Sequence, residues 1–596
     1  MLQGQSAGAS RRGKIRFKRV LEAILILACA SALALVLFKG WDHAAATFDR
    51  LWVRSWAQPL LVLAQILMVV NLAAMVWRIY LMCTYRPMPG CRDEDLPVVT
   101  VVVPAYNEGR QVAETLRSVL ASDYPPEKFQ IIAVDDGSQD DTWQWMQRAH
   151  AEAPDRITLI QQPRNMGKRR ALYDGFKRGS GQVFVTIDSD SLVLADTIRN
   201  LVTPIARDAK VGGVAGNVRV LNRRQGLIPR MMEVSFTFSF DFIRASQSRV
   251  NTVICTPGAL SAYKRDAVMP VLDGWLTQTF LGKPANIGED RAMTNLILES
   301  GYHVLFQRNA MVYTEVPTRY RNLCKMFLRW ARSNVRESLA MTRFIFRDFR
   351  TTPKSGARVN LMLEVINLTL MQLLKLVGLL WLTTLPLGIS LNLLFGALMG
   401  GGILALFYAI RHRSLASVWG LPYGVYNLLS LSWISTYALC TPHNSGWLTR
   451  QQTSGAVRTR PPAWGWRLAA TRAGAMASAL VVGSSLAWAL TNPMTQPLAK
   501  EIAQPAGPVT ATVRHQGMPV WTVRATAMEE VPLGLGPITL SGVDMVLYSE
   551  GRVVSRVRAD QAVLNLEDSK SFTFKGRVRM NPTHRAKQSE LSSLSS

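Results

Sequence analysis

Cysteine is scarce in this chain of 596 residues, and its distribution argues against two kinds of site. The six cysteines are Cys29, Cys83, Cys91, Cys255, Cys324 and Cys440. They lie far apart, so they show neither the short spacing of metal ligands nor an obvious disulfide pairing. The cysteines therefore indicate neither a metal centre nor a disulfide framework.

Acidic residues are also few, because 41 Asp and Glu stand against 68 Lys and Arg, for a formal net charge of +27. An excess of this size is compatible with a nucleic-acid partner. Much of it, however, lies beside long uncharged runs, where basic residues anchor the cytoplasmic side of a membrane protein and contact anionic lipid. We therefore expect membrane lipid as a partner, and no nucleic acid.

Charge is absent from five long runs, which predict a multi-pass membrane protein. These runs are residues 23–38, 55–77, 376–410, 414–439 and 473–490. The third run, of 35 residues, is too long for one crossing of a hydrocarbon core about 30 Å thick. Because it contains Pro386 and Gly388, it predicts a helical hairpin that begins near Asn360.

The first 19 residues are basic and contain no acid, which places the N-terminus in the cytoplasm. Their cations are Arg11, Arg12, Lys14, Arg16, Lys18 and Arg19. We expect two transmembrane helices within residues 20–82. The segment 28–32, Ala-Cys-Ala-Ser-Ala, is also compatible with a signal-peptide cleavage site. In either case the second helix delivers residues 80–350 to the cytoplasm.

Between residues 95 and 318, short β-branched runs alternate with helix-like segments. The runs are residues 98–103, 131–134, 157–160 and 183–187, and the helical segments include 113–120 and 142–151. This alternation predicts a cytoplasmic, Rossmann-like α/β domain with a largely parallel sheet. Ligands of such folds bind at the carboxyl ends of the strands.

Polar side chains follow three of these strands. They form the segments Tyr106-Asn107-Glu108, Asp135-Asp136-Gly137 and Asp188-Ser189-Asp190. An aromatic ring and carboxylates near the first strands, those of Tyr106, Glu108 and Asp136, can stack on and hydrogen-bond a uracil base. Asp188 and Asp190 supply the oxygen ligands that Mg²⁺ or Mn²⁺ prefers, and the phosphates of a nucleotide-diphosphate donor complete the set.

Five further residues extend this constellation. Lys168, which follows a glycine, can reach a diphosphate. Asp290 can act as a general base, with Glu289 beside it as a substrate-binding acid. Arg329 offers a charge for a leaving diphosphate, and Trp330 offers a surface for a sugar ring.

Each motif taken singly also has a plainer interpretation. The two aspartate-rich segments can be turns that end strands, and the basic run at Lys168 can be a solvated face. Glu289 and Asp290 can cap a helix that starts near Arg291, and Trp330 can be an interfacial anchor. The order of all the motifs on one α/β-plus-membrane layout favours the catalytic interpretation.

Together these residues resemble the processive family-2 glycosyltransferases, especially the hyaluronan synthases and the rhizobial chitin-oligosaccharide synthases. The matching segments are residues 165–172, 245–248, 255–258, 263, 288–295, 301–302, 314–318 and 328–333. The resemblance covers about residues 95–340, with a similar membrane layout to about residue 490. Two positions depart from the family. Met326 stands where the Gln-x-x-Arg-Trp motif has Gln, and Pro257-Gly258 inverts the usual Gly-Pro order.

The resemblance implies a glycosyltransferase A-type domain and an inverting β-hexosyltransferase. It implies a UDP-sugar donor, with UDP-N-acetylglucosamine the first candidate, and a growing polysaccharide acceptor that leaves through the enzyme's own channel. Two alternatives stay open. One is a non-processive transferase that glycosylates a polyprenyl phosphate, and the other is a catalytically silent scaffold of an exopolysaccharide export complex. The carboxylates of Asp188, Asp190 and Asp290 argue against the scaffold. The non-processive enzyme needs neither Arg329-Trp330 nor a channel, and this chain has both that dipeptide and enough predicted helices to line a channel.

The segment 319–358 holds eleven Lys or Arg among aromatic residues and predicts amphipathic helices at the membrane interface. Residues 359–490 are expected to supply channel helices, with 414–439 interfacial or re-entrant. In the predicted cytoplasmic loop 441–468, Trp447-Leu448-Thr449-Arg450 is similar to the Trp-Gly-Thr gating motif of these synthases. The similarity implies that Trp447, Thr449 and Arg450 bind substrate.

Residues 505–581 alternate apolar and polar side chains, which predicts a small all-β domain with a hairpin turn at Glu550-Gly551. The preceding stretch 441–472 has five arginines and no acid, so we expect it to stay cytoplasmic while residues 473–490 cross outward. This topology predicts a periplasmic β domain on a protein of the bacterial inner membrane. The spacing in residues 547–578 resembles periplasmic lipopolysaccharide-export β-jelly-roll domains, which implies an export partner. Residues 582–596 are expected to be disordered.

Overall fold

A computed structural model describes residues 3–53, 55, 57–351, 355–381, 386–444, 509–515, 518–529, 538–549, 552–564 and 572–582. The chain divides into two compact units, Met1–Trp488 and Ala489–Ser596. Each is described below by itself.

The first unit is built on an eight-stranded sheet whose first half is parallel. Its strands are β1 (Val99–Ala105), β2 (Phe129–Asp135), β3 (Ile157–Gln161) and β4 (Val183–Ile187), paired in the order β3-β2-β1-β4. Helices α3 (Gln111–Leu120), α4 (Thr142–Glu152) and α5 (Lys168–Arg178) connect them. All four predicted strands are confirmed, and each polar segment named above falls at the carboxyl end of its strand.

The second half of the sheet mixes strand directions. It contains β5 (Ser191–Val193), β6 (Val211–Val220), β7 (Leu260–Lys264) and β10 (His303–Thr314), in the order β7-β6-β10-β5 after β4. Strand β7 runs antiparallel to both neighbours, and β5 runs antiparallel to β10. The prediction of a largely parallel sheet therefore holds for the first four strands but not for the second half.

Hydrophobic side chains cover both faces of the sheet, which explains why its strands are almost continuous apolar runs. Along β1, Val101 and Val103 belong to one core cluster and Val102 to another, because successive side chains point to opposite faces. Helices α3, α4 and α6 (Thr197–Arg207) pack into the first cluster. Helices α5 and α11 (Glu289–Glu299) pack into the second.

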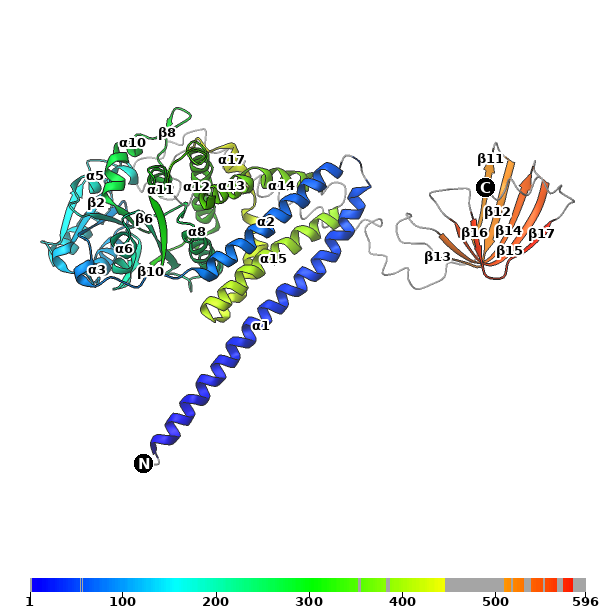
Figure 1. Ribbon diagram of the computed structural model, residues 1–596, viewed down its shortest axis with the longest axis horizontal. Coiled ribbons are helices and arrows are strands. Elements are labelled where there is room, and N and C mark those ends of the chain that lie inside the picture. The colour runs from blue at the N-terminus through cyan, green and yellow to red at the C-terminus, as the bar shows by residue number, and fades with distance from the viewer. Residues whose placement is uncertain are drawn as a thin grey trace. The chain divides into compact units, whose positions relative to one another are not determined.

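Apolar helices precede and follow this sheet. They are α1 (Gln3–Trp52), α2 (Gln58–Thr84), α13 (Ser355–Leu368), α14 (Leu370–Trp381) and α15 (Pro386–His412). Four helices in the described ranges are long and apolar enough to cross a membrane, namely Val20–Trp52, Gln58–Thr84, Ser355–Lys375 and Gly388–His412. Helix α15 lies along α1 (Figure 1). The predicted break in the long run falls where α15 begins, and Pro386 suits a first helical position because its missing N–H has no intrahelical partner there.

Helix α12 (Tyr320–Met341) links the sheet to the later helices. Leu323, Met326 and Leu328 are buried in the first core cluster, and α12 packs against α11 and α17 (Trp433–Cys440). Much of this basic segment is therefore covered by protein, and its predicted place at the membrane interface stays a prediction. The predicted interfacial run 414–439 is broken into η5 (Leu415–Trp419), α16 (Gly420–Tyr426), the π-helical turn η6 (Asn427–Leu431) and α17.

Shorter elements complete the first unit. They are η1 (Asp93–Asp95), η2 (Pro126–Lys128), α7 (Leu227–Thr237), the π-helical turn η3 (Phe238–Ile243), α8 (Arg244–Ser248), α9 (Arg265–Val268), η4 (Met269–Val271), α10 (Leu272–Leu276), β8 (Thr279–Phe280) and β9 (Lys283–Pro284). Helix α7, η3 and α8 follow one another directly, so residues 227–248 form one long irregular helix beside the sheet.

The second unit contains one antiparallel sheet in the part that the structure describes. Its strands are β11 (Val509–His515), β12 (Met518–Ala525), β13 (Ala527–Glu529), β14 (Ile538–Ser549), β15 (Arg552–Leu564), β16 (Phe572–Lys575) and β17 (Arg579–Pro582). Strands β14 and β15 pair antiparallel from Ser549 and Arg552 onward, as a hairpin requires, and the predicted turn at Glu550-Gly551 lies outside the described residues. The likeness to lipopolysaccharide-export domains stays a prediction.

Candidate functional site

A cavity of about 1080 Å³ in the first unit joins the sheet to the apolar helices. At one end it is lined by Lys168, Asp188, Asp190, Glu289 and Asp290, which come from α5, the end of β4 and the start of α11. It is also lined by residues of the candidate spans and of the broken run that follows them, among them Arg78, Glu364, Lys375, Asn392, Asn427 and Ser435. One continuous space therefore connects the carboxylates at the strand ends with helices suited to a membrane.

Lys168 ties two parts of the site together. Its ammonium group forms an ion pair with Asp188 and a second one with Glu289, at 3.2 Å. Burial alone would lower the pKa of Lys168, but the two carboxylates outweigh it and raise that pKa above its usual value. The same pairing acts on Glu289, where burial alone would raise the pKa but Lys168 and Arg329 hold it below its usual value. This cluster provides a fixed positive charge beside two anions.

Asp290 lies at the start of α11, where the helix dipole favours an acid. The turn before it needs glycine, because Gly288 has a φ of 77° and a Cβ there would overlap the side chain of Ser333 on α12. The Asp290 carboxylate accepts hydrogen bonds from the N–H of Arg291 at 2.7 Å and from the N–H of Gly258 at 3.3 Å. Burial, followed by the neighbouring Glu289 carboxylate, raises the pKa of Asp290 above the ordinary range. A buried carboxylate with a raised pKa is suited to accept a proton near neutral pH.

Asp188 and Asp190 fit a divalent cation only together with a substrate. Both line the cavity, and Asp190 accepts hydrogen bonds from the Ser191 and Thr314 hydroxyls, each at 3.2 Å. Among the described residues, no group of three or more His, Cys, Asp or Glu side chains could hold a metal. A hard cation such as Mg²⁺, however, often takes one or two carboxylates and completes its shell with substrate phosphates. The two aspartates match that donor set.

Three residues predicted to contact a uracil base lie at the carboxyl ends of β1 and β2. Tyr106 and Glu108 are half-buried, and Glu108 accepts a hydrogen bond from the Ser189 hydroxyl at 3.0 Å. The carboxylate of Asp136 accepts hydrogen bonds from the N–H groups of Met166, at 2.7 Å, and Gly167, at 2.9 Å. Asp136 therefore orders the loop that presents the lysine of the site, a positioning role that the sequence alone did not indicate.

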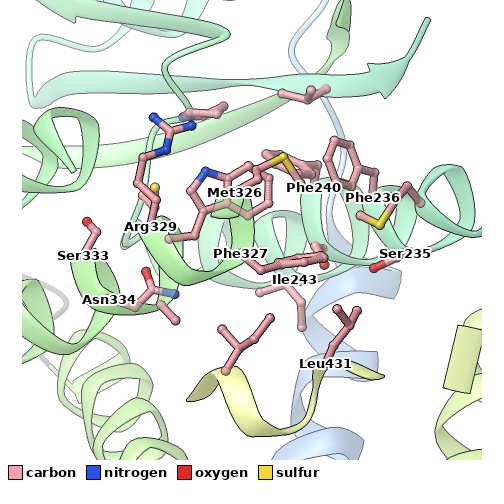
Figure 2. A pocket seen from close by; sticks show the side chains of 18 of the residues that line it. Ser235, Phe236, Phe240, Ile243, Met326, Phe327, Arg329, Ser333, Asn334 and Leu431 are labelled. Atoms are coloured by element: carbon pink, nitrogen blue, oxygen red, sulfur yellow. The ribbon is translucent and has the colours of Figure 1, made fainter. Parts of the chain in front are cut away.

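Arg329 and Trp330 stand on α12 and line the same cavity. The Trp330 ring lies 6.0 Å from the Phe236 ring and 5.6 Å from the Phe327 ring, measured between centroids. Figure 2 shows Phe236, Phe240, Met326 and Phe327 gathered on one side, with Arg329, Ser333 and Asn334 towards the other. Rings of this kind can contact the apolar faces of sugars, while the polar side can hydrogen-bond their hydroxyl groups.

Trp330, Phe236, Phe240 and Phe327 form an aromatic wall of the cavity, and sequence reasoning did not identify Phe236 and Phe240. Phe236 and Phe240 lie one helical turn apart on α7 and η3, with ring centroids separated by 4.9 Å. Their spacing of four residues was the available signal, but it is equally typical of a buried helix face. Lys375 was also missed, and its ammonium group donates to the carbonyl oxygen of Ser432 and to the hydroxyl of Ser435. Trp447, Thr449 and Arg450 lie outside the described residues.

Comparison with known proteins identifies the family. A model described as "Glycosyltransferase like family 2" matches residues 97–333, the part of the chain that forms the sheet and most of the carboxylate end of the cavity. An N-acetylglucosaminyltransferase of Mesorhizobium japonicum is 31% identical over 373 residues, which cover 61% of this chain and 85% of that protein. The chain belongs to glycosyltransferase family 2.

A hyaluronan synthase of Streptococcus pyogenes is also similar, with 30% identity over 395 residues that cover 65% of this chain and 90% of the synthase. Among solved structures, a mannosyltransferase of Pyrobaculum calidifontis has a TM-score of 0.39 and 22% identity, over 68% of this chain and 99% of that one. The resemblance inferred from the motifs is confirmed at the level of the family, and the protein is a glycosyltransferase with an α/β domain and apolar helices on either side of it in the sequence.

Proposed function

We propose that this glycosyltransferase is a membrane-embedded, inverting and processive enzyme that polymerises a UDP-sugar, with UDP-N-acetylglucosamine the first candidate, and passes the polysaccharide through its own helices. One observation carries the proposal. The cavity that contains the carboxylate cluster lies within the first unit. The same cavity is also lined by residues of helices that are long and apolar enough to span a membrane. A polysaccharide elongated beside the carboxylates would leave through the part of this cavity that the helices line.

The donor would be held by its phosphates. Asp188 and Asp190 would bind a divalent cation together with the diphosphate, and that cation would neutralise the negative charge of the leaving UDP. Lys168 and Arg329 both line the cavity and offer positive charge to the diphosphate. Tyr106 and Glu108, at the end of β1, are the residues proposed to contact the base.

Asp290 would act on the acceptor. Its carboxylate is held by two backbone N–H groups and has a raised pKa, so it can take the proton of a sugar hydroxyl as that oxygen attacks the donor. The attack forms a new glycosidic bond, breaks the bond between the sugar and UDP, and inverts the anomeric carbon. Glu289, with its pKa held low beside Lys168, would stay ionised and keep the lysine in place.

The acceptor would rest on the aromatic wall. Trp330, Phe236 and Phe327 form connected ring contacts along the cavity, which suits the alternating apolar faces of a sugar chain. The later helices contribute polar residues to the lining, among them Asn392, Asn427 and Ser435, beside apolar ones such as Leu393 and Leu431. Polar side chains at this depth are costly in a membrane unless they face a water-filled path or a hydrophilic substrate.

A reconstitution experiment tests the proposal. The purified protein in sealed vesicles is supplied with labelled UDP-N-acetylglucosamine, UDP-glucuronic acid, or both, and the product is sized by mass spectrometry. We expect long chains that accumulate inside the vesicles, where added glycosidase cannot digest them. Products of one added sugar on lipid would establish the non-processive alternative, and the absence of transfer from any nucleotide sugar would favour the scaffold. Long chains that are wholly digestible would refute export while leaving polymerisation in place.

A further inference from the structure

The second unit carries a row of charged residues across one face of its sheet. In register, Arg524 of β12 pairs with Asp544 of β14, Asp544 pairs with Arg558 of β15, and Arg558 pairs with Arg579 of β17. Directly paired residues on neighbouring strands point to the same face, and so do residues two apart on one strand, which adds Arg556. We name these four arginines, 524, 556, 558 and 579, the arginine face.

The opposite side of these strands forms the core of the unit. Val523, Met545 and Val557 alternate with residues of the arginine face and are buried in one hydrophobic cluster. The alternation fixes which side is exposed, because a slip of one residue would expose the whole apolar set. The arginine face is therefore a stable consequence of the strand register.

Charge on this face is only partly neutralised. Asp544 accepts from Arg556 at 2.7 Å and 2.6 Å and lies 3.4 Å from Arg558. Within the described residues, Arg524 and Arg579 form no ion pair. Arg558 and Arg579 are directly opposite each other, an arrangement of like charges that destabilises a sheet. An anion bound between them would remove that cost.

The surroundings of the arginine face are suited to a polar polymer. The four guanidinium-bearing side chains are exposed, and that of Arg558 is 65% exposed. The next row along the strands holds Thr522, Val546 and Asn581 beside Arg556, so hydroxyl and amide groups accompany the cations. A lipid-binding face would place bulky apolar side chains beside its cations, and in these two rows only Val546 is apolar.

We infer that the arginine face binds an acidic polysaccharide, a chain of sugars that carry carboxylate groups. Guanidinium groups pair with carboxylates through two parallel hydrogen bonds, a geometry that lysine does not offer. Neighbouring strands lie about 4.8 Å apart, so the arginines present cations at intervals of about 5 to 10 Å across the sheet, which suits an extended polyanion. The choice of a glycan among polyanions rests on the proposed function, in the form in which UDP-glucuronic acid is used beside UDP-N-acetylglucosamine, because a polymer of N-acetylglucosamine alone carries no carboxylate.

A binding experiment on the full-length protein in neutral phosphatidylcholine nanodiscs tests this inference. The probes are oligogalacturonate, as a defined acidic glycan, and dextran of similar length, as a neutral one. We expect oligogalacturonate to bind, with an affinity that falls as salt rises, and dextran not to bind. The double variant Arg558→Gln/Arg579→Gln should weaken oligogalacturonate binding at least about fivefold, because two charge-assisted contacts are lost.

Controls separate this inference from folding and from catalysis. The matched variant Arg148→Gln/Arg207→Gln removes two exposed arginines of the first unit and should bind as the unaltered protein does. Thermal unfolding of Arg558→Gln/Arg579→Gln should stay close to that of the unaltered protein, because the loss of the exposed Arg558–Asp544 ion pair opposes the removal of the like-charge contact and no core residue changes. UDP release, measured in parallel, should be normal in both double variants. If the proposed function is wrong, UDP release will fail while the binding measurements still test the arginine face.

Three results would overturn the inference. The first is no binding of oligogalacturonate by the unaltered protein. The second is an unchanged affinity in Arg558→Gln/Arg579→Gln. The third is arginine-dependent binding to phosphatidylglycerol vesicles without binding to oligogalacturonate, which would make this a lipid surface.

Discussion

Replacement of Asp290 by Asn isolates the proposed general base with little change in shape. Asn keeps one oxygen that can accept from the N–H of Arg291 or Gly258, but it cannot take a proton from a hydroxyl group. A positioned general base contributes about 10²- to 10⁴-fold to the rate, which corresponds to about 3 to 5.5 kcal/mol of activation free energy. We therefore expect transfer in Asp290→Asn to fall by at least about a hundredfold.

The stability of Asp290→Asn is expected to stay close to that of the unaltered protein. One accepted hydrogen bond is lost, at a cost of about 1 kcal/mol. The raised pKa of Asp290 means that its ionised form is less favourable in the folded protein than in the unfolded chain, so ionised Asp290 destabilises the fold above that pKa. Removal of this charge offsets the lost bond, and the offset is present above the raised pKa of Asp290 but vanishes as the pH falls and the carboxylate is protonated.

Three measurements check this prediction. The first is transfer from UDP-N-acetylglucosamine in detergent or nanodiscs, and the second is the affinity for UDP by calorimetry, which should change little. The third is the pH profile. Because the base must be ionised, activity of the unaltered enzyme should fall as pH decreases through the raised pKa, at a higher pH than an ordinary aspartate would give. The residual activity of Asp290→Asn should lack this acidic limb.

A control variant and two contrary outcomes complete the design. Asp266→Asn alters an aspartate whose side chain is 74% exposed on α9, away from the cavity, and should leave transfer unchanged. If Asp290→Asn retained more than about a tenth of the rate, far above the loss expected for a missing base, the assignment would be wrong. A large loss of UDP affinity would instead show that Asp290 acts on the donor.

Three further predictions follow from the cavity and the second unit. Trp330→Ala should shorten or abolish the polymer, as measured by product sizing, while UDP release by hydrolysis continues; full-length product would count against its place on the acceptor wall. Chelation by EDTA should stop transfer until Mg²⁺ or Mn²⁺ is added back, and Asp190→Ala should raise the metal concentration needed for half-activity at least about tenfold; metal-independent transfer would remove the proposed cation. A fusion after Ser596 should give active alkaline phosphatase and dark green fluorescent protein, whereas the reverse pair would place the second unit in the cytoplasm.

The long apolar helices and the first half of the sheet were predictable because they depend on local patterns. The strands β1 to β4 are short apolar runs buried on both faces, and their periodicity is visible within a few residues. The uncharged runs predict helices by length alone, and the proline at residue 386 marks where one begins. The antiparallel pairing of β14 with β15 was predictable from the alternation of apolar and polar residues within each strand.

The second half of the sheet could not be predicted in the same way. Strand β10 lies between β6 and β5, which precede it by about a hundred residues, and β7 enters antiparallel between β4 and β6. Such pairings are chosen by packing among segments distant in sequence, and a strand's own residues carry little information about its partner's direction. The sequence therefore predicted the class of the domain but not its topology.

The candidate site shows the same division. Asp188, Asp190, Asp290 and Lys168 were identifiable because carboxylates and a lysine after strands or turns have few purely structural uses in that order. Only the tertiary structure decided that Asp136 bonds the backbone before Lys168, and that aromatic rings from α7 and η3 join Trp330 in one cavity. The sequence determines the chemistry of each side chain. Which side chains meet depends on the free energy gained when surfaces of several elements are buried together, and that burial occurs only in the folded chain.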